Sequence, residues 1–545
     1  MSPRTLTLIP IVVVAVFLGL LVLIVTGGGD DDGGSGSAAT AEIADPLAEA
    51  LTFVPTDAPL VGVVETDTAA GPAAALQALG GRIPGAALAS GALGELLGDQ
   101  ELQAELLPLL GNPLVVTATE LPREDATPAP AGLPFRVPSP RRLAEHVRVA
   151  TVVRDRAGLD AMLDRMTGTG MLQRDGESRG FDRYTRTDGA SLAVDGPVLV
   201  ATGSRTDLGQ ALTLHARATR GGGAAGGDGT GALTPVGLRE RLAGLPGRGA
   251  AVARIAADVE ELQDADLSEL EVPWLSALRR VALALVPSED GLDVRFRLAT
   301  DPESVTDGDV PIATGPETAS PAAQEDAPVV VGIRNVAHTI EFVRRTLRST
   351  APELAAQVDG VESSLRRLAR VDPSSQLLLK LTGTTTVTLG PGGGVEVRAE
   401  VRDPEMIEDV LRRLPSAAAG GALTGGVSGE VDLAGIALRD QGDGTYVVER
   451  DGGPLARVAV LGEALVVSTD DSTDLQALAD AFPESPSEGA RGALTARVSA
   501  EEAIDLVGLS PDLAEALGTF GTVTLQARGE TEAVSGSIGL VEGDE

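Results

Sequence analysis

The sequence predicts an α+β fold in which an N-terminal transmembrane helix precedes two homologous halves with largely antiparallel sheets and packed helices. Three observations support this prediction: a charge-free apolar run near the N-terminus, short strand patterns joined by hairpin turns, and four phrases that occur twice in the same order. A chain of 545 residues is long enough for several domains. We place the halves at residues 46–300 and 327–545.

The apolar run extends from Leu6 to Thr26, and its 21 residues are enough to cross a bilayer as a helix. It is longer than the apolar core of a cleaved signal peptide, so we expect a retained membrane anchor. Arg4 precedes the run, and three aspartates, Asp30–Asp32, follow it. The positive-inside rule then puts residues 1–5 in the cytoplasm and the large domain outside the cell membrane. Residues 27–45 are rich in Gly, Asp and Ser and predict a flexible tether.

The evidence for two halves begins with "GPVLVATGSRTDLGQAL" at Gly196, which returns 266 residues later as "GEALVVSTDDSTDLQAL". "VRVATVVRDRAGLDAMLDRM" at Val147 matches "VEVRAEVRDPEMIEDVLRRL" 248 residues later. Two shorter matches align Gly111 with Gly383, at an offset of 272, and Arg248 with Arg491, at an offset of 243. The offset changes at low-complexity stretches, where surface loops tolerate insertions. Four matches in one order predict a duplication.

The second match also predicts two equivalent helices. Asp155 and Asp403 stand where a carboxylate caps a helix N-terminus, and Pro404 fits the first helical position. The apolar residues that follow are spaced to form one stripe on each helix. They are Leu159, Met162, Leu163 and Met166 in the first half, and Ile407, Val410, Leu411 and Leu414 in the second.

Strand patterns are numerous in the first half. They occupy residues 59–65, 113–119, 147–153, 191–194, 198–202 and 250–256, and residues 280–299 form an alternating hairpin around a turn at Ser288–Gly291. The clearest helix extends from Ala351 to Arg370, with Thr350 and Glu353 in a capping-box pattern. Hairpins favour antiparallel sheets, since parallel neighbours need crossover helices. The acidic, proline-containing segment 301–326 has the composition of a linker between the halves.

One stretch carries a family resemblance. "LTFVPTDAPLVGVVETDTAAGPAAALQALGGRIPG", from Leu51 to Gly85, combines a short "VPTDAP" lead, a strand and a downstream "IPG". It resembles the opening of the bacterial domain of unknown function 3352. The resemblance implies an N-terminal membrane segment and a long extracytoplasmic region. That family has no established activity, so it implies no catalytic residues.

Composition excludes several classes of function. The net charge of −36 would repel polyanions, so we expect no nucleic-acid partner. The absence of cysteine excludes disulfides, thiolate metal sites and a cysteine nucleophile. Only 2% of the residues are aromatic, and this predicts cores of Leu, Val, Ala and Ile.

No catalytic, cofactor-binding or metal-ligating set emerges from the motifs. His146, His215 and His338 are far apart and lack metal-like spacing. Lys380, the sole lysine, has no serine three residues before it, and no nucleophile elbow, phosphate loop or dinucleotide glycine pattern occurs. We therefore predict no cofactor and no metal site.

Two acidic clusters and three arginine pairs remain as weaker candidates. Asp470–Asp474 could offer oxygens to calcium, but a helix start at Asp471 or Ser472 is the favoured interpretation. Residues 439–453 carry Asp440 and Asp443 among glycines, a pattern typical of a hairpin turn. The pairs Arg344/Arg345, Arg366/Arg367 and Arg412/Arg413 could meet an anionic ligand, although salt-bridged helix surfaces are the favoured interpretation.

Three hypotheses for function follow, in order of preference. The first is a non-enzymatic envelope protein, anchored by one helix, that presents a duplicated domain to an envelope protein, cell-wall or lipid partner. The second is a carrier of an apolar or lipid-like ligand, because interiors poor in aromatic residues could leave a cavity between the halves. The third is a hydrolase that uses dispersed carboxylates. Paired buried carboxylates in a cleft would favour the enzyme, and an aliphatic tunnel would favour the carrier.

Overall fold

The structure is a computed structural model of the chain. It describes residues 44–67, 106, 109–121, 127–128, 136–137, 145–187, 189–220, 231–247, 249–259, 272–288, 291–315, 318–321, 327–350, 352–368, 370–381, 383–390, 393–419, 436–450, 453–481, 492–502, 518 and 520–542. The proposed span Leu6–Thr26 and the tether 27–45 lie outside these residues, apart from the last two of the tether. None of the helices within these ranges is long and apolar enough to cross a membrane.

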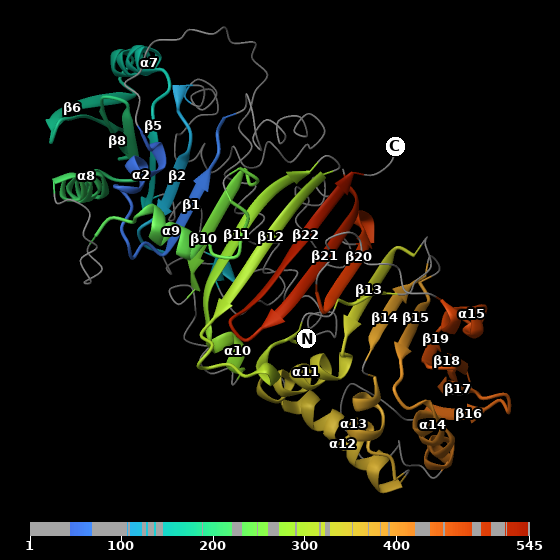
Figure 1. The fold of residues 1–545 in the computed structure, drawn as a ribbon. Coiled ribbons are helices and arrows are strands. Elements are labelled where there is room, and N and C mark those ends of the chain that lie inside the picture. Colours follow the sequence, from blue (N-terminus) through green and yellow to red (C-terminus); the bar gives the residue numbers. More distant parts are fainter. Residues whose placement is uncertain are drawn as a thin grey trace.

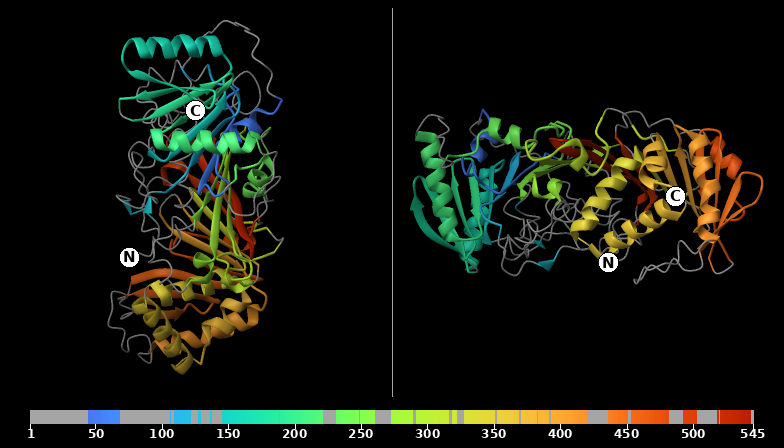
Figure 2. Two further views of the ribbon diagram at one scale, coloured as in Figure 1. Left: turned by 90° about the vertical axis from the view of Figure 1, so that its left-hand side faces the viewer. Right: turned by 90° about the horizontal axis from the view of Figure 1, so that it is seen from below.

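The described strands form one antiparallel sheet of twenty strands, which gives the molecule an elongated form (Figures 1 and 2). A separate pair, β3 (Thr127–Pro128) and β4 (Arg136–Val137), stands apart from it. The first half of the chain contributes β1 (Leu60–Val64), β2 (Leu114–Ala118), β5 (Val147–Val152), β6 (Leu172–Ser178), β7 (Phe181–Arg186), β8 (Ser191–Asp195), β9 (Val198–Thr202), β10 (Ala253–Asp258), β11 (Leu278–Ser288) and β12 (Gly291–Thr300). The second half contributes β13 (Val329–Arg334), β14 (Thr384–Leu389), β15 (Val395–Glu400), β16 (Ile436–Asp440), β17 (Thr445–Arg450), β18 (Gly453–Leu461), β19 (Ala464–Ser468), β20 (Leu494–Ser499), β21 (Phe520–Glu530) and β22 (Ala533–Glu542).

Strand order is the same in both halves. From the outer edge inward, the first half reads β6, β7, β8, β9, β5, β2, β1, β10, β11, β12. The second half reads β16, β17, β18, β19, β15, β14, β13, β20, β21, β22. Each strand of one half therefore has a counterpart at the same place in the other.

The two halves join where β12 pairs with β22, and we call this ladder the seam. Gly291 pairs with Val541, Arg295 with Ser537, and Ala299 with Ala533. Gly291 and Ala533 are the first residues of their strands, and each pairs with a residue near the far end of the other. The residue pairing along the seam is therefore symmetric about a twofold axis that passes between Arg295 and Ser537.

Ladder registers give the residue equivalences between the halves independently of the sequence matches. Going outward from the seam, Ala150 corresponds to Arg398 and Val200 to Val466, which reproduces the offsets of 248 and 266. The 272 offset is wrong by one residue, since Val115 corresponds to Thr386. The 243 offset is wrong by two, since Arg254 corresponds to Thr495. Apolar runs of five or six residues match nearly as well when shifted, and a shift by two keeps every side chain on its face.

Each end of the sheet has helices on both faces (Figures 1 and 2). The described helices of the first half are α2 (Pro46–Leu51), α7 (Arg156–Gly168), α8 (Arg205–Arg220), α9 (Pro235–Arg241) and α10 (Pro273–Ser276). Those of the second half are α11 (Val336–Thr350), α12 (Pro352–Leu368), α13 (Pro373–Gln376), α14 (Pro404–Ala419) and α15 (Leu475–Asp480), with the 3-10 turns η6 (Asp307–Asp309) and η7 (Leu378–Lys380).

The predicted helix stripes point to equivalent faces of the sheet. The apolar side of α7 packs with Leu199, while α8 packs with Val198 and Val200 on the opposite face. In the second half, α14 packs with Leu465, and α15 packs with Ala464 and Val466. All four predicted residues of α7 are buried, as are the first three of α14.

The predicted caps are confirmed. Asp155 accepts a hydrogen bond from Gly158 N at 3.0 Å, and Asp403 accepts one from Met406 N at 3.3 Å. A carboxylate at this place satisfies an amide that has no partner within the helix. The predicted helix 351–370 is confirmed as α12, which is shorter at its C-terminal end.

Segment 301–326, which the sequence predicts to be a linker, connects β12 to β13, and its described part packs on the sheet. Val305, Val310 and Ile312 are buried against the apolar face of the central strands. Thr314 forms a bridge with Gly529, where a Cβ atom would come within 2.6 Å of the Ile312 carbonyl oxygen. Glycine at position 529 lets the connection lie directly on β21.

Candidate functional site

The three histidines lie in separate places, as their spacing predicts. Nδ1 of His146 is 3.6 Å from Glu120, and Nε2 of His338 contacts the Val310 carbonyl oxygen at 2.8 Å. His215, on α8, stacks on Phe53 at 4.5 Å between ring centroids and meets the edge of Phe181. Its Nδ1 shares a 2.8 Å hydrogen bond with Thr52 Oγ1.

Burial lowers the pKa of the His215 imidazole below its usual value, and Glu49 opposes this shift only in part. Loss of hydration disfavours the charged ring, because the stacked aromatic side chains offer it no hydrogen-bond acceptor. His215 is therefore a packed, neutral ring of the first half.

The acidic cluster Asp470–Asp474 is a turn and a helix cap. Asp470 accepts from Ser472 N at 2.8 Å, and Asp474 accepts from Gln476 N at 2.9 Å and Ala477 N at 3.2 Å. The predicted helix start at Asp471 or Ser472 is wrong, since α15 begins after Asp474. Asp470 folds back on Ser472 in a local turn, and this delays the helix.

Residues 439–453 contain the predicted hairpin, formed by β16 and β17. Asp440 accepts from Gly442 N at 2.7 Å, and Asp443 accepts from Thr445 N at 2.9 Å. Gly442 and Gly444 have φ values of 84° and 89°, a conformation that favours glycine. These two carboxylates therefore accept hydrogen bonds from the backbone of the turn to which they belong.

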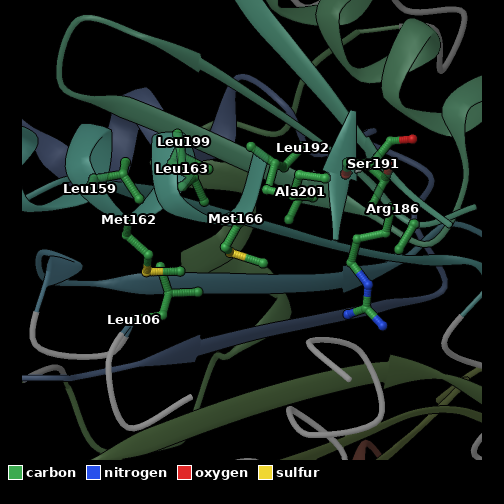
Figure 3. Close-up of a pocket in the computed structure, with 13 residues that line it drawn as sticks. Leu106, Leu159, Met162, Leu163, Met166, Arg186, Ser191, Leu192, Leu199 and Ala201 are labelled. Atoms are coloured by element: carbon green, nitrogen blue, oxygen red, sulfur yellow. Dashed lines mark hydrogen bonds between the residues drawn. The ribbon is translucent and has the colours of Figure 1, made fainter. Parts of the chain in front are cut away.

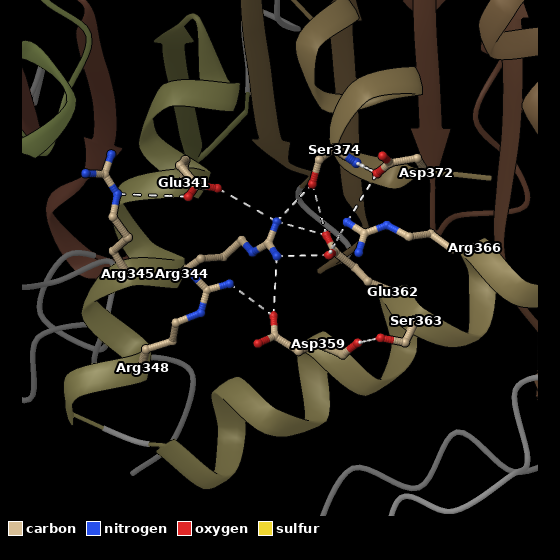
Figure 4. Close-up of polar contacts among 10 residues, drawn as sticks. All are labelled: Glu341, Arg344, Arg345, Arg348, Asp359, Glu362, Ser363, Arg366, Asp372 and Ser374. Carbon is tan, nitrogen blue, oxygen red and sulfur yellow. Dashed lines mark hydrogen bonds and ion pairs between the residues drawn. The ribbon is translucent and has the colours of Figure 1, made fainter.

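Polar contacts join α11, α12 and α13 in one network, with Arg344 at its centre (Figure 4). The Arg344 guanidinium lies 2.8 Å from Glu362 and 3.4 Å from Asp359, and it donates to Ser374 Oγ at 3.0 Å. Glu362 also contacts Arg366 at 3.2 Å. The side chains of Arg344 and Glu362 are only 12% and 10% exposed, so this pair ties the helices together from within.

The other predicted arginines for which the structure gives partners also meet carboxylates. Arg345 contacts Asp309 of η6 at 3.1 Å. Arg412 and Arg413 both contact Asp409 one turn earlier on α14. Lys380 contacts Asp403 at 3.2 Å and thereby links η7 to the cap of α14. Intramolecular ion pairing is thus the role that the geometry gives these residues.

Sequence reasoning missed a buried ion pair on the first half's sheet. Arg148, on β5, donates to both carboxylate oxygens of Asp207 at the start of α8, with a shortest contact of 2.6 Å. The side chains are 3% and 10% exposed. Arg148 also donates to the Phe53 carbonyl oxygen at 3.2 Å and so joins β5, α8 and the chain after α2.

The second half has a different pair at the same place. Arg148 corresponds to Glu396 and Asp207 to Thr473, and Thr473 Oγ1 donates to Glu396 Oε1 at 2.8 Å. Both partners differ from those of the first half, and each half has a hydrogen bond between the strand and the segment after the neighbouring strand. The aligned repeats hold this signal, because one match pairs Arg148 with Glu396 and another pairs Asp207 with Thr473.

A small cavity lies between α7 and the strands beneath it (Figure 3). It has about 50 Å³ of internal space. Its walls are mainly Leu and Met side chains, with Arg186 at one end and Leu159 at the other. Pockets for drug-sized molecules are roughly 300–1,000 Å³, so this space suits only a small apolar group.

The carboxylates of the described residues do not form a metal cluster. No group of three or more His, Cys, Asp or Glu side chains gathers in that part of the chain. Three of the buried acids, Asp207, Glu362 and Glu396, are each held by the partner described above. Asp207 and Glu396 join the sheet to the segments that follow its strands, and Glu362 joins helices to one another.

Comparison with known proteins assigns no family. No protein-family model matches the chain, and no curated protein does. Three solved structures, crystal forms III, IV and I of TP0453, share 9%, 10% and 9% sequence identity with it. They cover 48%, 47% and 47% of this chain and 83%, 80% and 78% of their own, with TM-scores of 0.27, 0.25 and 0.26. Likeness at this level carries no functional argument.

Proposed function

We propose that the protein is a membrane-anchored extracytoplasmic envelope protein that acts as a non-enzymatic binding or structural module. The observation that carries this proposal is the seam, which joins two modules of the same strand order into one sheet. Such a sheet holds two similar, helix-covered ends at a fixed separation. We further propose that the halves arose by duplication and that Leu6–Thr26 anchors them to the membrane.

The polar contacts favour a structural role over catalysis. The buried carboxylates Asp207 and Glu362 each face a guanidinium in close contact, with shortest distances of 2.6 and 2.8 Å. A general acid or base must be able to exchange its proton with substrate. A carboxylate held by a buried arginine has its oxygens occupied by that partner.

A carrier of a large apolar ligand receives less support. The cavity under α7 has about 50 Å³ and belongs to the first half alone rather than lying between the halves. A whole lipid requires several times this space.

Single-cysteine labelling tests the proposed topology, since the natural chain has no cysteine. Thr187→Cys, at an exposed position, should react with a membrane-impermeant maleimide in intact spheroplasts. Ser2→Cys should react only after the membrane is permeabilised. The reverse pattern would reject the orientation, and labelling of a soluble fraction would reject the anchor.

Photocrosslinking from the two ends tests the binding role. Met171 and Leu455 are exposed apolar residues of the first and second halves, with exposures of 51% and 45%. A photoreactive residue at either position should give discrete adducts with envelope components in living cells, because a module that binds a partner at each end must contact it there. Val541, 39% exposed and on the seam, is the matched control that should give none. Equal labelling from all three positions would contradict a role for the ends.

A further inference from the structure

Two arginines of the seam lie on one face of the sheet. Arg295 and Arg297 are alternate residues of β12, so their side chains leave the same face. Across the seam they pair with Ser537 and Ser535, whose side chains are short. Strands β12 and β22 lie between the two helix-covered ends of the sheet (Figure 1). We call these two arginines and two serines the seam face.

Both guanidinium groups of the seam face have room for a further contact. The Arg295 side chain is 49% exposed, and its one ion pair among the described residues is a 3.8 Å contact with Asp293 on the same strand. Arg297 has no hydrogen bond or ion pair within the part of the chain that the structure describes. Its side chain lies beside Gly244, where a Cβ atom would come 3.3 Å from the Arg297 Nη1 atom. Two cations therefore lack a close anionic partner, although the chain has 79 acidic residues and only 43 basic ones.

The tether contains an acidic segment that complements these charges. Asp30–Asp32 place three carboxylates in a row, with glycines on both sides in the sequence GGGDDDGG. Glycine has no side chain to keep a backbone away from a surface, so such a segment can lie close to the short serines of the seam face.

The tether also enters the fold on the same face as the two arginines. Leu51 of α2 belongs to the same apolar cluster as Ala282 of β11, and Ala282 pairs directly with Arg297. From β2, which lies in that cluster, to β12 is four strand spacings, or about 19 Å. Asp32 precedes Ala44, the first described residue, by twelve residues, which span at most about 40 Å. The acidic segment can therefore reach the seam face.

We propose that the seam face is the docking site of this chain's own segment Asp30–Asp32. The aspartate carboxylates pair with the guanidinium groups of Arg295 and Arg297. A tethered segment meets its site at an effective concentration on the order of millimolar, so exposed charge pairs of modest strength suffice to hold it. The docking does not depend on the proposed anchor. With Leu6–Thr26 in the membrane, it would turn the seam face toward the bilayer.

Disulfide formation measures this docking, since the natural chain has no cysteine. The experiment uses the full chain in nanodiscs of uncharged lipid, with Gly33→Cys beside the aspartates and Ser537→Cys on the seam face. In a glutathione redox buffer, the fraction of disulfide gives the effective concentration of one thiol at the other. We expect this concentration to fall about tenfold when Arg295→Gln and Arg297→Gln are added, as expected for two or three exposed charge pairs.

Variants of the tether and of a distant cation provide the matched controls. Asp30→Asn, Asp31→Asn and Asp32→Asn together should lower the effective concentration by the same factor as the arginine variants. Sodium chloride at about 0.5 M should remove most of the difference, because it screens exposed charges. Arg439→Gln removes a cation that is 62% exposed at the far edge of the second half, and it should have no effect.

Reversal of both sets of charges separates docking from misfolding. Arg295→Glu and Arg297→Glu should abolish the gain, and Asp30→Lys, Asp31→Lys and Asp32→Lys in the same chain should restore it. A damaged sheet would not be repaired by changes in the tether.

Three outcomes would overturn the proposal. The first is an effective concentration that does not respond to Arg295→Gln and Arg297→Gln. The second is disulfide between two molecules rather than within one, seen as a doubled mass, which would assign the seam face to a second copy. The third is loss of the intramolecular disulfide in nanodiscs that contain anionic lipid, which would assign the face to lipid headgroups.

Discussion

At the scale of single residues, the two halves place different pairs of side chains at the same position of the fold. Arg148 and Asp207 form a buried ion pair where Glu396 and Thr473 form a neutral–charged hydrogen bond. Removing one partner of a buried pair leaves an uncompensated charge, which costs more than removing both. Each half therefore has a matched pair at this place, and neither half leaves one partner alone.

This reasoning makes Arg148 a strong test of stability. Arg148→Met should lower the free energy of unfolding by about 3–5 kcal/mol, because Asp207 would be left buried without its partner. Arg148→Met combined with Asp207→Leu should recover most of the loss. Chemical denaturation of the wild type and of each variant measures this difference. A double variant as unstable as the single one would show that packing, not the stranded charge, sets the cost.

His215 predicts a pH dependence. Its folded pKa lies below the unfolded value of about 6.5, so the unfolded chain binds the proton more readily. Its contribution to stability is complete above the unfolded pKa and is lost as pH falls from there through the folded pKa. Denaturation of wild type and His215→Gln at pH 7.5 and 5.0 should show a smaller pH effect in the variant. His146→Gln, at a more exposed site, is the control.

Among the elements, β12 and β22 depend on small residues at the seam. A Cβ atom at Gly536 would lie 2.0 Å from the Gln526 carbonyl oxygen and 2.7 Å from the Phe296 ring. Gly536→Val should therefore separate the strands around the seam and speed hydrogen exchange of the β12 and β22 amides. Ser535→Val, one residue earlier on β22, should leave exchange near the wild-type rate. Equal effects of the two variants would mean that crowding at Gly536 is not what matters.

The elements that sequence predicts best are those whose pattern has one interpretation. Asp155 and Asp403 mark their helices because a cap and an apolar stripe agree, and the Ser288–Gly291 turn fixes a hairpin in register. Strand β6 was not predicted, since its residues from Gln173 onward are largely polar and exposed, as befits an outer edge. The shifted offsets arose because short apolar runs carry little register information.

The candidate sites were predictable only in part. The arginine pairs were expected to form salt bridges, but their spacing along the chain does not reveal that Arg344 and Glu362 meet inside a three-helix junction. The cavity under α7 depends on a missing volume, which sequence does not encode directly. Its lining residues come from α7 and from strands that lie apart in the sequence, and only the folded chain brings them together.

At the scale of the whole molecule, the continuous sheet predicts that the two ends keep a fixed separation. Spin labels at Thr187→Cys and Leu455→Cys, in a chain with no other cysteine, should give one narrow distance distribution by pulsed electron resonance. The ladder of hydrogen bonds between the ends leaves no hinge among the described strands. A broad or two-peaked distribution would show that the halves move about the seam.

The register of the seam has a consequence for how such a chain came to exist. Because equivalent residues face one another across the axis at Arg295 and Ser537, each module presents the same strand edge to its neighbour. A closed symmetric dimer of identical subunits uses this isologous arrangement. If the halves arose by duplication, as proposed above, the fusion of two subunits of a homodimer would leave this arrangement. Such a fusion would let each copy change separately, and the differing pairs at Arg148 and Glu396 are differences of the kind that it would allow.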